Sequence, residues 1–92
     1  MLKLTKVKNV NVTLVVSDFC HECDELETEL KRIICKTDRL NFIKIHKNDF
    51  NNLVSSNGFK IHITPALIIN GRLIQYGNPG NRRLKKIFYK LI

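Results

Sequence analysis

The chain has 92 residues, which is enough for one domain and too few for two. Its hydrophobic fraction of 43% is typical of a globular protein, and three cysteines are too few, and an odd number, for a secreted disulfide framework. No stretch approaches the roughly 20 apolar residues of a membrane span, and the first 16 residues do not resemble a signal peptide. We therefore expect one soluble, cytoplasmic domain over residues 1–92, with residues 1–9 as a basic lead-in.

The formal net charge of +8 is unevenly distributed along the chain. Six of the eight acidic residues fall between Asp18 and Glu29, and no Lys or Arg lies in that window. The remaining sequence is basic and rich in Lys, Asn and Ile, which favours lysines scattered over solvated faces. A nucleic-acid or anionic-membrane surface on the basic part is the less favoured interpretation. We therefore expect a monomer with no membrane partner, and a nucleic-acid partner is not the favoured expectation.

The first half of the chain predicts a strand, a helix and a strand. Residues 10–16 are rich in valine and become apolar on both faces, which is typical of a central strand covered on both sides. Residues 21–36 carry a one-sided apolar stripe at helical spacing. Residues 40–46 alternate as a second strand, and the helical crossover makes these two strands parallel. Residues 48–57 predict one short helix.

The second half predicts a hairpin and a terminal helix. Residues 66–69 and 72–76 form the two strands, because Asn70-Gly71 suits a type I′ turn that needs positive φ twice. Residues 81–92 carry a second apolar stripe. The predicted fold class is α/β, in the order βαβαββα, with a four-stranded mixed sheet flanked by helices.

The motif Cys20-His21-Glu22-Cys23 lies at the start of the first helix. Free N–H groups and the positive end of the helix dipole stabilise a thiolate there, and the thiolate is the form that attacks disulfides. Cys23 lies one turn further along, within reach of Cys20. The motif therefore predicts Cys20 as the nucleophile and Cys23 as the resolving thiol of a redox pair.

With Phe19 before this motif and the segment from Phe59 through Thr64-Pro65 to Gly71, the chain resembles small thioredoxin- and glutaredoxin-like proteins. The resemblance covers residues 10–92. It implies a thioredoxin-like fold with a cis Thr64–Pro65 peptide facing the cysteines and a Thr64 backbone that pairs with the substrate. It also implies electron transfer without a cofactor beyond the Cys20–Cys23 disulfide.

Three features of the sequence depart from that family. His21-Glu22 replaces the usual central dipeptides, Leu14 stands where thioredoxins carry a buried aspartate, and Phe19 replaces a tryptophan and is expected to contact substrate. The sequence has no clear glutathione-binding set, although Thr64 and residues 77–80 occupy suitable places.

Several residues have more than one interpretation. The alternative for Cys20 is an inert cysteine, and the alternative for Cys23 is a metal ligand. A structural zinc site needs four ligands, however, and the sequence has no second CxxC pair. His21 is a proton shuttle or a solvated residue, and Glu22 is a proton acceptor for Cys23 or, preferably, a solvated acid. His62 is better interpreted as a surface residue than as a rim of the substrate groove.

Cys35 lies nearly opposite the apolar stripe and about 18 Å along the helix from Cys23, which is beyond disulfide reach. It is predicted to be either a free thiol or a packing residue.

The favoured function is a thiol–disulfide oxidoreductase that reduces protein or small-molecule disulfides. Its partners are then disulfide-containing substrates and an electron donor, either a thioredoxin reductase or glutathione. The alternative is a non-redox thioredoxin-fold module that binds protein, metal or nucleic acid.

Overall fold

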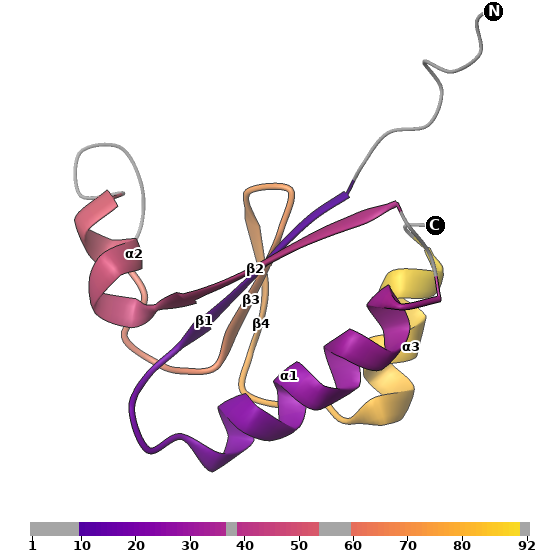
Figure 1. The fold of residues 1–92 in the computed structure, drawn as a ribbon, viewed down its shortest axis with the longest axis horizontal. Helices are drawn as coiled ribbons and strands as arrows, with labels where there is room; N and C mark the ends of the chain where they lie inside the picture. The colour runs from indigo at the N-terminus through magenta and orange to yellow at the C-terminus, as the bar shows by residue number, and fades with distance from the viewer. Residues whose placement is uncertain (1–9, 37–38, 54–59, 91–92) are drawn as a thin grey trace, which may run out of the picture.

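The computed structural model describes residues 10–36, 39–53 and 60–90 of the chain. Figure 1 shows a twisted sheet with helices on both of its faces. The elements in chain order are β1 (Val10–Val16), α1 (His21–Ile34), β2 (Leu40–His46), α2 (Lys47–Leu53), β3 (Ala66–Ile69), β4 (Arg72–Tyr76) and α3 (Asn81–Tyr89). In these described parts, no helix has the length and apolar character to cross a membrane.

The four strands form one mixed sheet in the order β2-β1-β3-β4. β1 pairs in parallel with β2 along its whole length, from Val10 opposite Leu40 to Val16 opposite His46. Its other edge pairs antiparallel with β3. The predicted βαβαββα order, the parallel first pair and the interior position of β1 are therefore confirmed.

Each face of the sheet carries its own apolar core. One core joins the β1 residue Leu14 to Leu26 and Leu30 of α1 and to Leu84 and Phe88 of α3. The other core lies beneath α2 and is built from Val15, Ile61, Ala66 and Ile68, with Phe50 packed against it. Because side chains alternate along a strand, neighbouring Leu14 and Val15 point into different cores, as a strand buried on both faces requires. Figure 1 shows α1 and α3 together on one side and α2 on the other.

The β3–β4 hairpin has the turn that its sequence predicts. Asn70 has φ +51° and Gly71 has φ +83°, so both central residues adopt the left-handed conformation. The structure adds a register shift between Leu67 and Ile68 that the sequence did not predict.

Some element ends differ from the predictions. α1 ends at Ile34 instead of residue 36, because Cys35 is the C-cap and the chain turns there. α2 begins at Lys47, directly after β2, and the end predicted for this helix lies outside the described residues. α3 ends at Tyr89, and residues 91–92, where its predicted end falls, also lie outside the description.

Candidate active site

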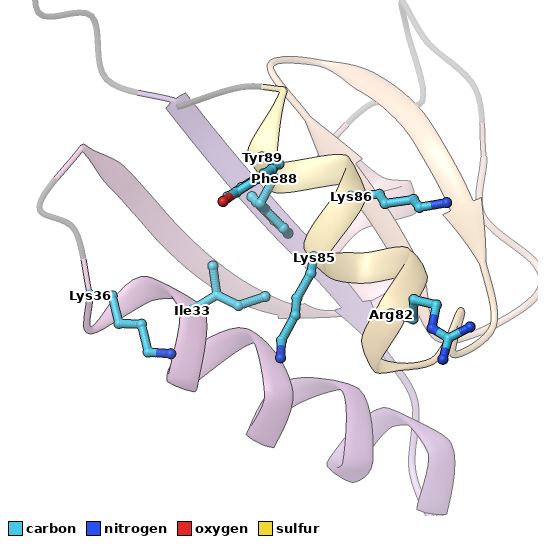
Figure 2. A pocket seen from close by; sticks show the side chains of 7 residues that line it. All are labelled: Ile33, Lys36, Arg82, Lys85, Lys86, Phe88 and Tyr89. Carbon is cyan, nitrogen blue, oxygen red and sulfur yellow. The ribbon is translucent and has the colours of Figure 1, made fainter.

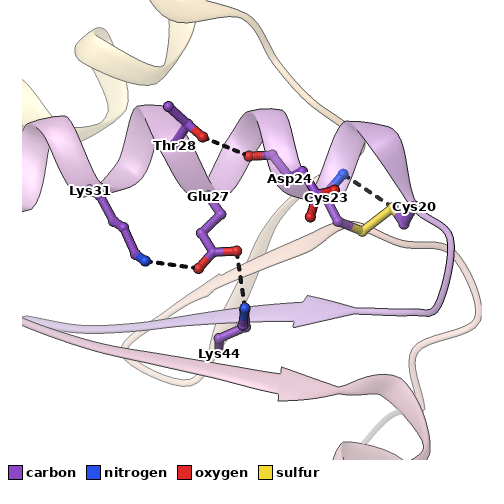
Figure 3. Close-up of polar contacts among 7 residues, drawn as sticks. All are labelled: Cys20, Cys23, Asp24, Glu27, Thr28, Lys31 and Lys44. Carbon is purple, nitrogen blue, oxygen red and sulfur yellow. Dashed lines mark hydrogen bonds and ion pairs between the residues drawn. A yellow bond between two sulfur atoms is a disulfide. The ribbon is translucent and has the colours of Figure 1, made fainter.

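Cys20 and Cys23 form a disulfide where β1 leads into α1. The sulfur–sulfur distance is 2.08 Å and the two Cα atoms are 5.2 Å apart. Cys20 is the N-cap of α1 with extended backbone angles, and its Sγ accepts a hydrogen bond from the Cys23 backbone N–H at 3.1 Å. Figure 3 shows this contact at the first turn of the helix. A cysteine sulfur thus occupies the place where Ser, Thr or Asp usually satisfies a free helix N–H.

The two sulfurs differ in accessibility. Cys23 is only 2% exposed and packs within the protein, whereas Cys20 is half-buried. A reactant from solvent therefore reaches Cys20 first. This order of access is what a nucleophilic thiol followed by a resolving thiol requires.

The segment around Thr64 and Pro65 lies directly beside Cys20. The Thr64–Pro65 peptide bond is cis, and Pro65 is buried. The Thr64 hydroxyl lies 4.0 Å from Cys20 Sγ and can donate to it, and Ser17 Oγ lies 2.6 Å from Thr64 Oγ1. The fold thus joins two motifs that are 44 residues apart in the chain.

Phe19 forms an exposed edge next to the disulfide. Its ring is fully exposed and its backbone φ is +52°, a conformation that non-glycine residues seldom adopt. Ile63, which precedes Thr64, is 58% exposed. Apolar side chains beside a reactive sulfur offer a contact surface for a disulfide-containing segment.

A family model described as a thioredoxin domain matches residues 8–89. The chain belongs to the thioredoxin-domain family. A comparison with curated protein sequences found no significant match.

Solved thioredoxin structures share the fold. The Drosophila melanogaster thioredoxin Deadhead is 19% identical, with a TM-score of 0.72 over 97% of this chain and 88% of its own. A variant thioredoxin from Halobacterium salinarum is 22% identical, with a TM-score of 0.69 over 94% and 77%. Mitochondrial thioredoxin 3 from Saccharomyces cerevisiae is 18% identical, with a TM-score of 0.64 over 95% and 83%.

In this thioredoxin-domain protein, the predicted modulators of the cysteines are solvated. His21 is exposed and its Nε2 lies 3.3 Å from Glu25 Oε2, one turn along α1. Glu22 is exposed as well, with its carboxylate close to the backbone of Gly77. His62 is exposed, in line with its interpretation as a surface residue.

Leu14 makes the interior beneath the disulfide entirely apolar. It is completely buried in the core between β1 and α1, and the described residues include no buried polar or charged side chain. No acid within this described core can take a proton from Cys23.

Three ion pairs near the site were not predicted. His46 Nε2 lies 3.4 Å from Asp18 Oδ1, at the carboxyl ends of the parallel strands β2 and β1. Glu27, on α1, lies 3.1 Å from both Lys31 and Lys44 (Figure 3). The adjacent ends of parallel strands were the available signal for the first pair, whereas Glu27 and Lys44 depend on how α1 packs over β2.

The pKa of Glu27 reflects opposing effects. Burial raises it, but the hydrogen bonds and positive charges of Lys31 and Lys44 outweigh burial and hold the pKa below its ordinary value. The carboxylate therefore stays ionised and ties the middle of α1 to β2.

Cys35 takes no part in this site. It is a free, exposed cysteine at the C-cap of α1, and its thiol donates to the Arg32 carbonyl at 3.2 Å. Of its two sequence interpretations, the structure supports the free thiol. In the described residues, no group of three or more His, Cys, Asp or Glu side chains is placed to hold a metal ion.

Proposed function

We propose that this protein is a dithiol reductase for disulfides in proteins, with Cys20 as nucleophile and Cys23 as resolving thiol. The observation that carries the proposal is the asymmetry of the pair. Cys20 is accessible and receives an N–H at the helix N-terminus, whereas Cys23 is buried beside it. A thiolate in that position is stabilised and can be reached.

The reaction proceeds in two exchanges. The Cys20 thiolate attacks one sulfur of the substrate disulfide, forms a mixed disulfide and releases the other substrate sulfur as a thiolate. Cys23 then loses its proton and attacks Cys20 Sγ, which forms the Cys20–Cys23 disulfide and releases the second substrate thiol. Two electrons pass to the substrate, and the structure corresponds to the oxidised protein.

Substrate binding is assigned to the surface around Cys20. An extended substrate segment pairs with the Thr64 backbone, as in the family, while Phe19 contacts apolar side chains beside the disulfide. Support comes from the proximity of Thr64 to Cys20 and from the full exposure of Phe19. Proline at position 65 has no amide N–H that could compete for the sulfurs and no side chain that could bind a metal between them.

A reductase or glutathione must return two electrons to the disulfide for turnover. We propose a thioredoxin reductase as donor, in a reducing compartment such as the cytoplasm, because the sequence lacks a clear glutathione-binding set. Two equivalents of glutathione supply the same electrons by successive thiol exchange, so parallel assays with the two donors distinguish them.

Reduction of insulin disulfides tests the proposal. The wild-type dithiol is expected to reduce insulin catalytically, Cys20→Ser to be inactive, and Cys23→Ser to accumulate a mixed disulfide with substrate. Cys35→Ser is the matched control, because it removes an exposed thiol far from the site, and it should retain full activity. Full activity in Cys20→Ser, or none in wild type with any reductant, would refute the proposal.

A further inference from the structure

The positive charge of the chain is concentrated around α3. Residues 50–92 contain seven Lys and Arg residues and no Asp or Glu, and five of the seven lie on α3 or directly after it. Two more cations line the grooves on either side of this helix. We call the whole set the α3 basic face, and its members are Lys36, Arg72, Arg82, Arg83, Lys85, Lys86 and Lys90.

These cations have no anionic partner within the described parts of the chain. The ion pairs seen there between Asp18 or α1 carboxylates and their partners do not involve the α3 basic face. Arg82 and Arg83 also lie in the first turn of α3, where the helix dipole is itself positive and no side chain caps the N–H groups. An external anion bound there would relieve the repulsion between these two arginines and the positive end of the helix dipole.

The face is hollowed as well as charged. A groove of about 540 Å³ runs between α3 and the end of α1, with Ile33 and Phe88 on its floor and Tyr89 beside them. Figure 2 shows Lys85 reaching from α3 toward α1 across this groove, with Lys36 on the α1 side. The Tyr89 side chain is 85% exposed, so an aromatic surface is available in the same groove as Lys36, Lys85 and Lys86.

We propose that the α3 basic face binds single-stranded nucleic acid, with phosphates on its lysines and arginines and a base stacked on Tyr89. Proteins that bind single strands without sequence preference combine a positive groove with aromatic stacking in this way. This inference is independent of the redox chemistry at Cys20.

Two other ligands, a second copy of the chain and an acidic polypeptide, match the α3 basic face less well than a single strand does. A second copy of the chain offers acidic residues on α1, but each copy carries a net charge of +8 and the copies repel. An acidic polypeptide pairs with the cations and makes no specific use of the Tyr89 ring. A single strand uses both, because every base has a π-face.

Titration of labelled oligo(dT) and oligo(U) of about 12 nucleotides at several salt concentrations tests this proposal. We expect binding that weakens linearly in log[salt]. Lys85→Glu with Lys86→Glu should weaken binding at least about tenfold and reduce the salt slope by about 1.4, or about 0.7 for each lost phosphate contact. Insulin reduction should stay at the wild-type rate, which also shows that the variant is folded.

The control is Lys47→Glu with Lys60→Glu, which changes the net charge by the same four units near α2, on the other side of the sheet. It should leave the salt slope unchanged. Tyr89→Ala should weaken binding about tenfold through lost stacking, with an unchanged salt slope, while Tyr76→Ala should have little effect.

Three results would overturn the proposal. The first is no binding at about 50 mM salt. The second is an equal loss in the two charge-reversal variants, which would indicate diffuse attraction. The third is competition by polyglutamate as strong as that by oligonucleotide, with no effect of Tyr89→Ala. That result would assign the face to acidic polypeptides.

Discussion

Ser17 and Thr64 link the two halves of the site through one hydrogen-bonded pair of hydroxyls. Thr64 has a single hydroxyl proton, so when it donates to Cys20 Sγ it must accept the proton of Ser17. Ser17 is therefore a positioning residue, which fixes the direction of the Thr64 hydroxyl without touching the sulfur.

Ser17→Ala is expected to reduce the reactivity of Cys20. Without Ser17 as a donor, Thr64 can turn its proton away from the thiolate, which loses a weak contact worth about 0.5 kcal/mol. The rate of Cys20 alkylation by iodoacetamide, measured in a Cys35→Ser background, should fall about twofold. Thr28→Ala removes a hydroxyl that bonds within α1 and should have no effect. An unchanged rate in Ser17→Ala would show that the Thr64 hydroxyl is held without Ser17.

The carboxylates around Cys20 are expected to set its redox potential. The helix N-terminus stabilises the thiolate, while Glu22 and Asp24 in the first turn oppose it by like-charge repulsion. Because a stabilised thiolate makes an oxidant, this near-balance predicts a reducing potential near the thioredoxin value of about −270 mV. Equilibration with glutathione buffers measures it.

Neutralising those carboxylates tests whether they set the potential. Glu22→Gln with Asp24→Asn should shift the potential by about 30 mV toward oxidising values, equivalent to about 1.4 kcal/mol. Glu29→Gln changes an acid further along α1 that already pairs with Arg32, and it should cause no shift. A wild-type potential above about −180 mV, the value of protein disulfide isomerase, would contradict the reductase assignment.

At the scale of elements, Glu27 links α1 to β2 through its ion pair with Lys44. Glu27→Gln is expected to lower the free energy of unfolding by about 0.5–1 kcal/mol at about pH 7, since Lys31 and Lys44 are both substantially exposed. The pKa of Glu27 is lowered in the folded protein, so its contribution is present above the ordinary value of 4.5 and is lost as pH falls through the folded pKa.

Urea unfolding at two pH values measures that contribution. The difference between wild type and Glu27→Gln should be larger at about pH 7 than at about pH 3, because it is lost as the pH falls through the lowered pKa of Glu27. Glu29→Gln, whose ion pair stays within α1, should cost less because it does not join two elements. A difference that persists unchanged in acid would assign the effect of Glu27 to packing.

The elements were predictable where a local pattern decides them. The alternation and valine content of residues 10–16, and the turn at Asn70-Gly71, fix the strands without reference to the rest of the chain. The proximity of Ser17 to Thr64 and of Glu27 to Lys44 depends on register and on how α1 lies over the sheet. Periodicity within one segment carries no such information, which is why these contacts were not predicted.

Ile43 shows the same limit within a single strand. Alternation places it on the face of Ile45, yet it is 58% exposed, whereas Ile45 packs against the core beneath α2. The pattern of β2 gives the face of each side chain, but the extent of the covering helix decides which positions are buried.

The whole molecule separates its charges between two regions. The carboxylates surround the disulfide end of α1, while the α3 basic face lies beside the later part of that helix and around α3. A substrate that approaches Cys20 therefore meets a negative surface on a protein whose net charge is +8.

This separation predicts that the enzyme prefers substrates that are basic near their disulfide. Reduction rates of two peptides with the same disulfide loop, flanked by lysines in one and by glutamates in the other, measure the preference. The lysine peptide should react several-fold faster at low salt, and the ratio should shrink as salt rises, because exposed charges are screened beyond about 10 Å at 0.1 M. Glu22→Gln with Asp24→Asn should reduce the ratio, whereas Lys85→Glu with Lys86→Glu should leave it nearly unchanged. Equal rates at low salt would show that the local carboxylates do not outweigh the net charge of the chain at Cys20.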